Sequence, residues 1–160
     1  MGAPPIMITP AAAFEDLKTA THEAGHAVIR HALGGTIFAV GIVNDATASG
    51  VCVREGSLDL LDNVVYLLAG GIAERKFSGG RRRDGDAEDY ESARRLVAGR
   101  WKTTPDDPRV EAMLARISIL AAARVTEHWP WIQRVAAEMV RRRVLNGDDI
   151  ERLRIGVDPL

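Results

Sequence analysis

The sequence predicts a mainly α-helical fold, a helical bundle around one central helix with a small antiparallel β-hairpin. Apolar residues recur at helical spacing through most of the chain. Only two short runs, 37–43 and 51–54, are rich in β-branched residues, and a turn-prone segment separates them. Two strands alone are marginally stable, so we expect them to lie against the helices. The length of 160 residues and the hydrophobic content of 46% suit one domain over residues 1–160.

The central helix is expected to begin at Pro10, which suits the first helical position, with the Thr9 hydroxyl as its cap. The Gly34–Gly35 pair is expected to end it. Residues 1–9 are expected to form a flexible arm. Two adjoining stripes predict that this helix is mostly buried. The stripes are Phe14, Leu17, Thr21, Ala24, Val28 and Ala32, and beside them His22, His26, Ile29 and Leu33.

The remaining chain is expected to be largely helical. Further helices are expected over residues 58–77, from 84 or 86 to 99, and over 110–127, 131–145 and 148–153. The Gly70–Gly71 pair would let its helix approach a neighbour closely, and Gly25 suggests a close approach to the central helix. Residues 78–85, rich in glycine and arginine, are expected to form a mobile loop. Trp129 and Trp131 are expected to pack a corner between two helices.

His22, Glu23 and His26 form the pattern His-Glu-x-x-His inside the central helix. Residues four apart lie on one helix face, with β-carbons about 5–6 Å apart. Both imidazoles can therefore reach one small cation, at the bond length of about 2.0–2.1 Å that zinc prefers. Glu23 lies about 100° around the helix from His22, to one side of the metal. The pattern predicts two metal ligands and a base.

Catalytic zinc takes three protein ligands, so a third must come from elsewhere in the chain. Asp89 is favoured because it lies on the inward stripe of its helix, where a carboxylate is costly unless it is paired or bound to a metal. Asp86, one turn earlier, is the second choice. The other candidates are Asp84, Glu88, Glu74, His31 and His128.

Three segments carry motifs that point to one family. Residues 21–28 are Thr-His-Glu-Ala-Gly-His-Ala-Val, residues 68–77 contain Gly-Gly-Ile-Ala-Glu, and residues 85–95 contain Asp89 near a helix start. They resemble the peptidase domain of the FtsH-type ATP-dependent zinc metalloproteases. The first is similar to that family's zinc-binding helix, and the second is similar to its Gly-Gly-x-x-Ala-Glu helix with one residue fewer after the glycines. The third is similar to the helix start that carries the family's third zinc ligand, which falls on Asp89. The resemblance covers residues from about 14 to 153, including the closing helices.

The resemblance implies a zinc metalloendopeptidase that holds one Zn²⁺ per chain and hydrolyses unfolded proteins or peptides, with Glu23 as general base. Glu74 or Asn63 could orient a ligand histidine. A substrate could add as a further strand beside Gly50, Val51, Cys52 and Val53. A structural hairpin is the alternative for that stretch, and a plain helix contact is the alternative for Glu74 and Asn63.

The chain also departs from that family. No Walker-type phosphate loop is present, and Glu88 stands where the family has asparagine. We therefore expect the unfolding ATPase to be absent or to be a separate protein. The family forms hexameric rings, but their assembly is coupled to the ATPase, so a homo-oligomer is left open. The alternative function is a metal-stabilised binding or adaptor module with little or no catalysis; the intact Glu23 argues against it.

Composition and net charge limit the kinds of partner and the cellular location that the sequence suggests. The net charge of −1 does not call for nucleic acid or an anionic membrane. No apolar run reaches the roughly 18–20 residues needed to span a bilayer. The single cysteine, Cys52, excludes an internal disulfide and suits a reducing compartment. These observations predict a cytoplasmic protein.

Overall fold

The computed structural model describes residues 10–43, 51–56, 58–80 and 84–155. The expected flexible arm, residues 1–9, lies outside the described residues, as does the centre of the expected mobile loop, residues 81–83. Helices and a small antiparallel sheet make up the described part, which confirms the predicted fold class. The elements are α1 Pro10–Ala32, β1 Thr36–Gly41, β2 Val51–Glu55, α2 Leu60–Ser78, α3 Asp84–Trp101, α4 Pro108–Glu127, α5 Trp129–Arg142, β3 Val144–Asn146 and α6 Gly147–Arg154.

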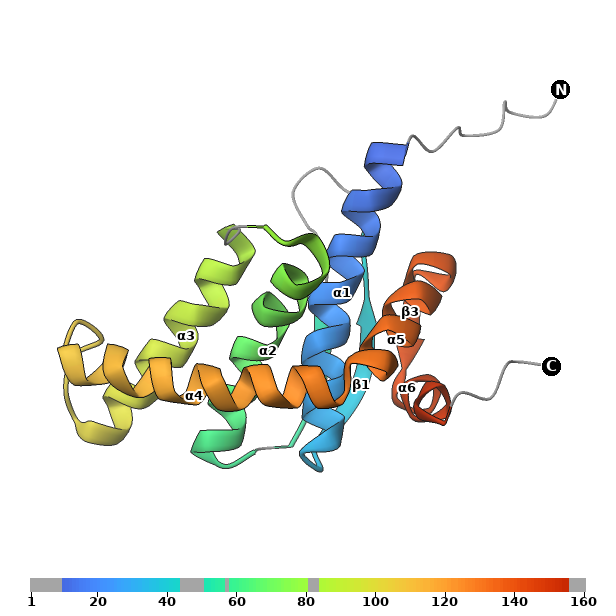
Figure 1. Ribbon diagram of the computed structural model, residues 1–160. Coiled ribbons are helices and arrows are strands. Elements are labelled where there is room, and N and C mark those ends of the chain that lie inside the picture. The colour runs from blue at the N-terminus through green and yellow to red at the C-terminus, as the bar shows by residue number, and fades with distance from the viewer. Residues whose placement is uncertain (1–9, 44–50, 57, 81–83, 156–160) are drawn as a thin grey trace, which may run out of the picture.

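Helix α1 runs through the centre of the fold (Figure 1). Helices α2 and α3 lie on one side of it, the sheet, α5 and α6 lie on the other, and α4 crosses between the two sides. Every residue from Ala20 to Arg30 is buried, whereas residues 10–15 are exposed. The predicted burial of this helix is therefore confirmed for its second half. The first turns project beyond the bundle.

Helices α1 and α2 cross closely at Gly25. A Cβ atom there would lie 2.8 Å from the Cβ of Ala73 and 2.9 Å from the carbonyl oxygen of Ala69. Real Cβ atoms essentially never approach so closely, so this crossing requires glycine, as the sequence suggested. The two helices run antiparallel. Contacts along them join Phe14 to Phe77, Lys18 to Glu74, and His26 to Tyr66.

The sheet has three strands in the order β2-β1-β3, so β2 is an edge strand. The third strand was not predicted, and the expectation of a helix over 131–145 is wrong at its end. Arg143 has a φ of 70°, which stops α5 one residue earlier. Leu145 then pairs with Val40 of β1 and is 1% exposed. Pairing with β1 satisfies backbone groups that helix propensity alone does not reveal.

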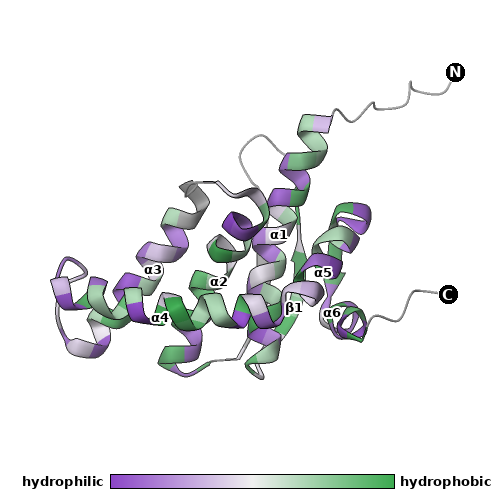
Figure 2. Cartoon of the chain, in the orientation of Figure 1, coloured by the Kyte–Doolittle hydropathy of each residue, from purple (hydrophilic) through white to green (hydrophobic). Residues whose placement is uncertain are grey.

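The C-terminal elements pack around Trp131, whose indole N–H donates to the carbonyl of Ile150 at 2.8 Å. Its ring makes edge contacts with the rings of His31 and His128. Trp131 thus joins α1, the α4–α5 junction and α6, which confirms its predicted role in a corner. Hydrophobic residues line the strands and much of α2, while α6 is largely hydrophilic (Figure 2). Within the described residues, no helix is long and apolar enough to cross a membrane.

Candidate metal centre

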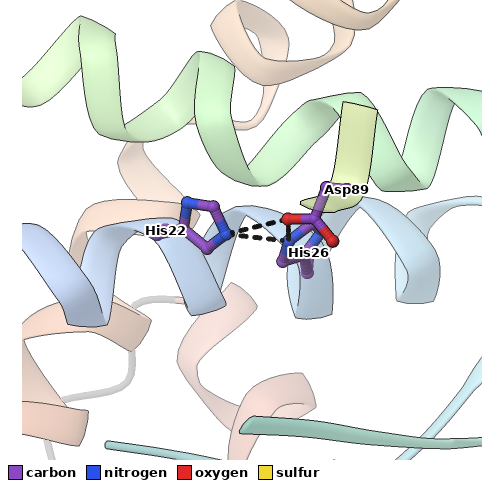
Figure 3. A group of neighbouring side chains, drawn as sticks. All are labelled: His22, His26 and Asp89. Carbon is purple, nitrogen blue, oxygen red and sulfur yellow. Dashed lines mark hydrogen bonds and ion pairs between the residues drawn. The ribbon is translucent and has the colours of Figure 1, made fainter. Parts of the chain in front are cut away.

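Three potential ligand atoms converge between α1 and α3 (Figure 3). His22 and His26 lie one turn apart in α1, and Asp89 faces them from α3. The Nε2 atoms of the two histidines are 3.1 Å apart. The Oδ2 atom of Asp89 lies 3.1 Å from Nε2 of His22 and 3.0 Å from Nε2 of His26. The structure thus brings together the three residues that the sequence suggested as ligands.

The other ring nitrogen of each histidine has a fixed hydrogen-bond partner. Nδ1 of His22 donates to Oε2 of Glu74 at 3.0 Å. Nδ1 of His26 donates to the backbone carbonyl of Tyr66 at 2.9 Å. Both partners are on α2, and both accept a hydrogen, so they favour the tautomer that leaves the Nε2 lone pair free. The two free lone pairs point at the Asp89 carboxylate.

Three electron-rich atoms at this spacing repel one another unless a proton or a cation lies among them. In the protein without metal, a proton held among these three atoms can relieve the repulsion. Burial acts to lower the pKa of His22, but hydrogen bonds to Asp89 and Glu74 and the charges of Glu23 and Asp89 outweigh it and raise that pKa to about 10. Burial likewise opposes ionisation of Asp89, yet the two histidines hold its pKa well below the ordinary value. The site therefore favours positive charge at its centre.

A zinc ion fits this donor set. Tetrahedral ligation with bonds of about 2.0–2.1 Å places ligand atoms roughly 3.3 Å apart, close to the three observed separations. Two imidazoles and one carboxylate are also common zinc ligands. No fourth histidine, cysteine, aspartate or glutamate joins the group in the described part of the chain. Three protein ligands with a remaining open position are typical of a catalytic rather than a structural zinc site.

Gly70 of α2 makes room for the His26 ring. A Cβ atom at this position would lie 2.3 Å from Nε2 of His26 and within 2.7 Å of two of its ring carbons. No side chain larger than hydrogen is compatible with the observed ring position. The predicted close approach of the Gly70–Gly71 helix therefore occurs at the side chain of a candidate metal ligand.

Glu23 is 8% exposed and faces the same group of charges. Burial raises the pKa of its carboxyl group, the charges of His26 and His22 lower it, and those of Asp89 and Glu74 raise it again. No hydrogen bond or ion pair holds this carboxylate among the residues that the structure describes. The carboxylate therefore lies buried beside the two histidines without a structural contact among the described residues that fixes it.

The three converging side chains differ in their exposure to solvent. The Asp89 side chain is 25% exposed, whereas the His22 and His26 side chains are 11% and 5% exposed. Asp89 is therefore the group of the three that is most exposed to solvent.

Other candidate ligands lie elsewhere. His31 pairs with Glu151 of α6 at 2.6 Å, and His128 lies at the junction of α4 and α5. Glu88 is exposed on the outside of α3. The side chains of Asp84 and Asp86 are outside the described part. Glu74, also a candidate ligand, instead contacts the far nitrogen of His22.

The two side chains suggested to orient a histidine differ in the structure. Glu74 contacts His22, whereas no hydrogen bond joins Asn63 to either histidine, and its buried Oδ1 has no partner among the described residues. The partner of His26 is instead the carbonyl of Tyr66, which sequence reasoning missed because a backbone group carries no residue-type signal. Lys18, whose Nζ is 3.8 Å from Oε1 of Glu74, was also missed. The one feature of the sequence that could have suggested Lys18 is its position one helical turn before His22.

The stretch suggested to receive a substrate strand is only partly described. Gly50 lies outside the described residues, while Val51, Cys52 and Val53 belong to β2. Their backbone pairs with β1 on one side, and β2 is the outermost strand on the other. The backbone arrangement is therefore compatible with addition of a further strand.

No protein-family model matches the sequence, and a search of curated proteins finds no significant match. The resemblance to FtsH-type peptidases therefore stays a prediction that rests on its three motifs. The geometry of the described residues carries the functional argument.

Proposed function

We propose that this protein is a zinc-dependent metalloendopeptidase that hydrolyses unfolded proteins or peptides. The observation that carries the proposal is the convergence of Nε2 of His22, Nε2 of His26 and Oδ2 of Asp89, with distances of 3.0–3.1 Å between them. The resemblance of the surrounding motifs to FtsH-type peptidases agrees with this chemistry. The proposed substrates are chains that are already unfolded or are delivered by an ATPase.

In this proposal, His22, His26 and Asp89 hold one zinc ion. When bound, zinc supplies Lewis acidity that polarises a peptide carbonyl and lowers the pKa of a coordinated water to about 7. Glu23 takes a proton from the attacking water and returns it to the departing amine. Its lack of a hydrogen-bonding partner among the described residues supports this role, because no structural contact has to break before the carboxylate accepts a proton.

Glu74 and the Tyr66 carbonyl serve the ligands rather than the substrate. Each accepts the Nδ1 hydrogen of one histidine, which fixes the ring orientation and makes Nε2 a better electron donor. Gly70 completes this arrangement by leaving space for the His26 ring. All three belong to α2, so the α1–α2 pairing supports the site.

The edge strand β2 offers a way to bind substrate through its backbone. An extended peptide that pairs with an exposed strand is recognised by main-chain hydrogen bonds and not by a particular sequence. Such binding requires an unfolded chain, which agrees with the proposed substrate class. A cytoplasmic location, proposed from the single Cys52, completes the proposal.

Hydrolysis of casein, with and without the chelator 1,10-phenanthroline, tests the proposal. We expect the wild type to cleave casein, the chelator to stop cleavage, and zinc to restore it. Glu23→Gln should keep the metal but lose activity by at least about 100-fold, while Glu88→Gln, an exposed neighbour of Asp89, should behave as wild type. Equal absence of cleavage by zinc-loaded wild type and Glu23→Gln would reject the peptidase and favour the binding module.

A further inference from the structure

Arg30 is a fully buried charged side chain whose role the motifs do not explain. It is 1% exposed and lies one helical turn after His26 in α1. Residues 22, 26 and 30 thus follow one another on one face of the helix. The guanidinium is therefore carried by the same rigid element as the two metal-binding histidines.

The guanidinium of Arg30 binds the open end of the β1–β2 pair. Its Nε donates to the carbonyl of Thr36 at 3.0 Å, and its Nη2 donates to the carbonyl of Gly56 at 2.8 Å. Thr36 is the first residue of β1, and Gly56 directly follows β2. Thr36 pairs with Glu55, so both carbonyls belong to the same end of the ladder. One side chain thus links the metal-binding helix to both strands.

The space around Arg30 is shaped for this contact. A Cβ atom on Gly35 would lie 2.8 Å from Cγ of Arg30, so the turn after α1 folds closely over its stem. The guanidinium also lies over the Tyr66 ring, 5.5 Å from its centroid. The carbonyl of that same Tyr66 accepts the Nδ1 hydrogen of His26. Arg30 therefore contacts both the residue that directly follows the edge strand and Tyr66, whose carbonyl supports a proposed metal ligand.

A purely structural explanation fits this position poorly. Burying a charge carries a desolvation penalty, and apolar residues of similar volume are often as stabilising or more so. A guanidinium instead offers a planar fork of donors that fixes two acceptors in direction as well as distance, which lysine cannot do. Arg30 therefore contributes mainly by fixing the positions of the two carbonyl groups that it contacts.

We propose that Arg30 is a positioning residue that holds the edge strand β2 at a fixed distance from the metal-binding helix, and so determines how an extended peptide reaches the site. This inference rests on the proposed peptidase function. Arg30 contacts neither metal nor substrate; it acts through β2. Its loss should impair long substrates that pair with β2, while substrates too short to pair, and zinc itself, should be little affected.

Arg30→Met and Arg30→Lys are the test variants, and Arg134→Met is the matched control. Arg134 also donates from Nε and Nη2 to two backbone carbonyls, those of Leu153 at 2.7 Å and Arg154 at 2.9 Å, but these belong to α6. The substrates are a fluorescein-labelled casein peptide of about twelve residues, able to pair along β2, and the blocked dipeptide furylacryloyl-glycyl-leucinamide. Zinc affinity and the melting temperature are measured for each variant.

For Arg30→Met we expect kcat/KM for the long peptide to fall at least about tenfold, mainly through KM, because a misplacement on the order of 1 Å can cost about 100-fold. Zinc affinity and kcat/KM for the blocked dipeptide should stay within about threefold of wild type. Arg30→Lys should show a smaller loss, because one donor replaces the fork, and it serves in place of Arg30→Met if that variant does not fold. Arg134→Met should change neither substrate.

A parallel fall for both substrates, or a loss of zinc affinity together with activity, would overturn the proposal and make Arg30 a structural residue. So would an effect equal to that of Arg134→Met. If the wild type hydrolyses neither substrate, the peptidase assignment fails, and binding of the labelled long peptide to the zinc-loaded proteins, measured by fluorescence anisotropy, decides on Arg30 separately. A Kd at least about tenfold weaker for Arg30→Met supports the inference; equal binding, or no binding to wild type, overturns it.

Discussion

Replacement of Gly70 by alanine is expected to destroy the proposed metal centre while leaving the fold in place. The added Cβ would lie 2.3 Å from Nε2 of His26. Ordinary contact between heavy atoms requires about 3.5 Å, so the ring must move by roughly 1 Å. The hydrogen bond from Nδ1 of His26 to the Tyr66 carbonyl, at 2.9 Å, resists that movement. The ring must therefore either break this bond or turn Nε2 away from Asp89.

Metal coordination tolerates a much smaller displacement. Bond lengths in a competent site stay within about 0.2 Å of their usual values. The ring movement of roughly 1 Å should therefore remove His26 from the ligand set, so that only His22 and Asp89 remain. We expect the zinc Kd to weaken by at least about 100-fold, because even the loss of a group that merely supports a ligand can weaken metal binding by about that factor.

Competitive titration with a chromophoric zinc chelator measures this loss, and thermal unfolding of the metal-free protein checks the fold. Gly99→Ala is the matched control, because this exposed residue of α3 has no atom within 4 Å of an added Cβ. It should gain up to about 1 kcal/mol from helix propensity and bind zinc as wild type does. Zinc binding by Gly70→Ala within about threefold of wild type would refute the argument from steric exclusion.

Three further predictions concern stability. Gly25→Ala should lower the free energy of unfolding by about 1–3 kcal/mol despite its better helix propensity, because its Cβ would meet Ala73 at 2.8 Å and force α1 from α2; an unchanged urea midpoint would contradict this. The metal-free protein should lose stability as the pH rises from about 6.5 towards the raised His22 pKa of about 10, because a raised pKa stabilises the folded state fully only below the pKa of the unfolded state. In melting curves, zinc should abolish this pH dependence, and a flat profile for the metal-free protein would contradict the prediction. Asp149 is buried, but hydrogen bonds from Arg142 and the Asn146 backbone outweigh burial and lower its pKa. The ionised carboxylate therefore stabilises the fold above its unfolded pKa of about 3.9, and this stabilisation is lost as the pH falls further. Asp149→Asn should be less stable than wild type at pH 7 and should approach the wild-type stability in acid; parallel stability profiles of the two proteins would exclude this role.

Much of the fold could be predicted because local patterns and tertiary packing agree. The two stripes of α1 correctly predicted its buried half, and Gly25 correctly suggested a close helix crossing. The third strand could not be predicted in this way. Leu145 suits a helix as well as a strand, and the choice depends on the pairing edge that β1 offers far away in the sequence.

In the candidate site, too, the residues that local patterns reveal could be predicted, whereas contacts that depend on tertiary packing could not. His22, Glu23 and His26 follow from spacing within one helix, and Asp89 follows from an acidic residue on an inward stripe. Side-chain identity also suggested Glu74, which contacts His22. The carbonyl of Tyr66 and the contacts of Arg30 with Thr36 and Gly56 involve backbone atoms, whose direction only the packed structure determines. Residue type therefore indicates ligands better than it indicates the groups that orient them.

Zinc stoichiometry tests the central claim most directly. Metal analysis of protein purified with zinc and dialysed should find about one ion per chain in the wild type. His22→Ala and Asp89→Ala should each lose most of it, whereas Glu88→Ala, the exposed neighbour of Asp89, should keep it. Full zinc retention by the Asp89→Ala protein, or no zinc in the wild type, would contradict the proposal that the three converging atoms form a metal centre.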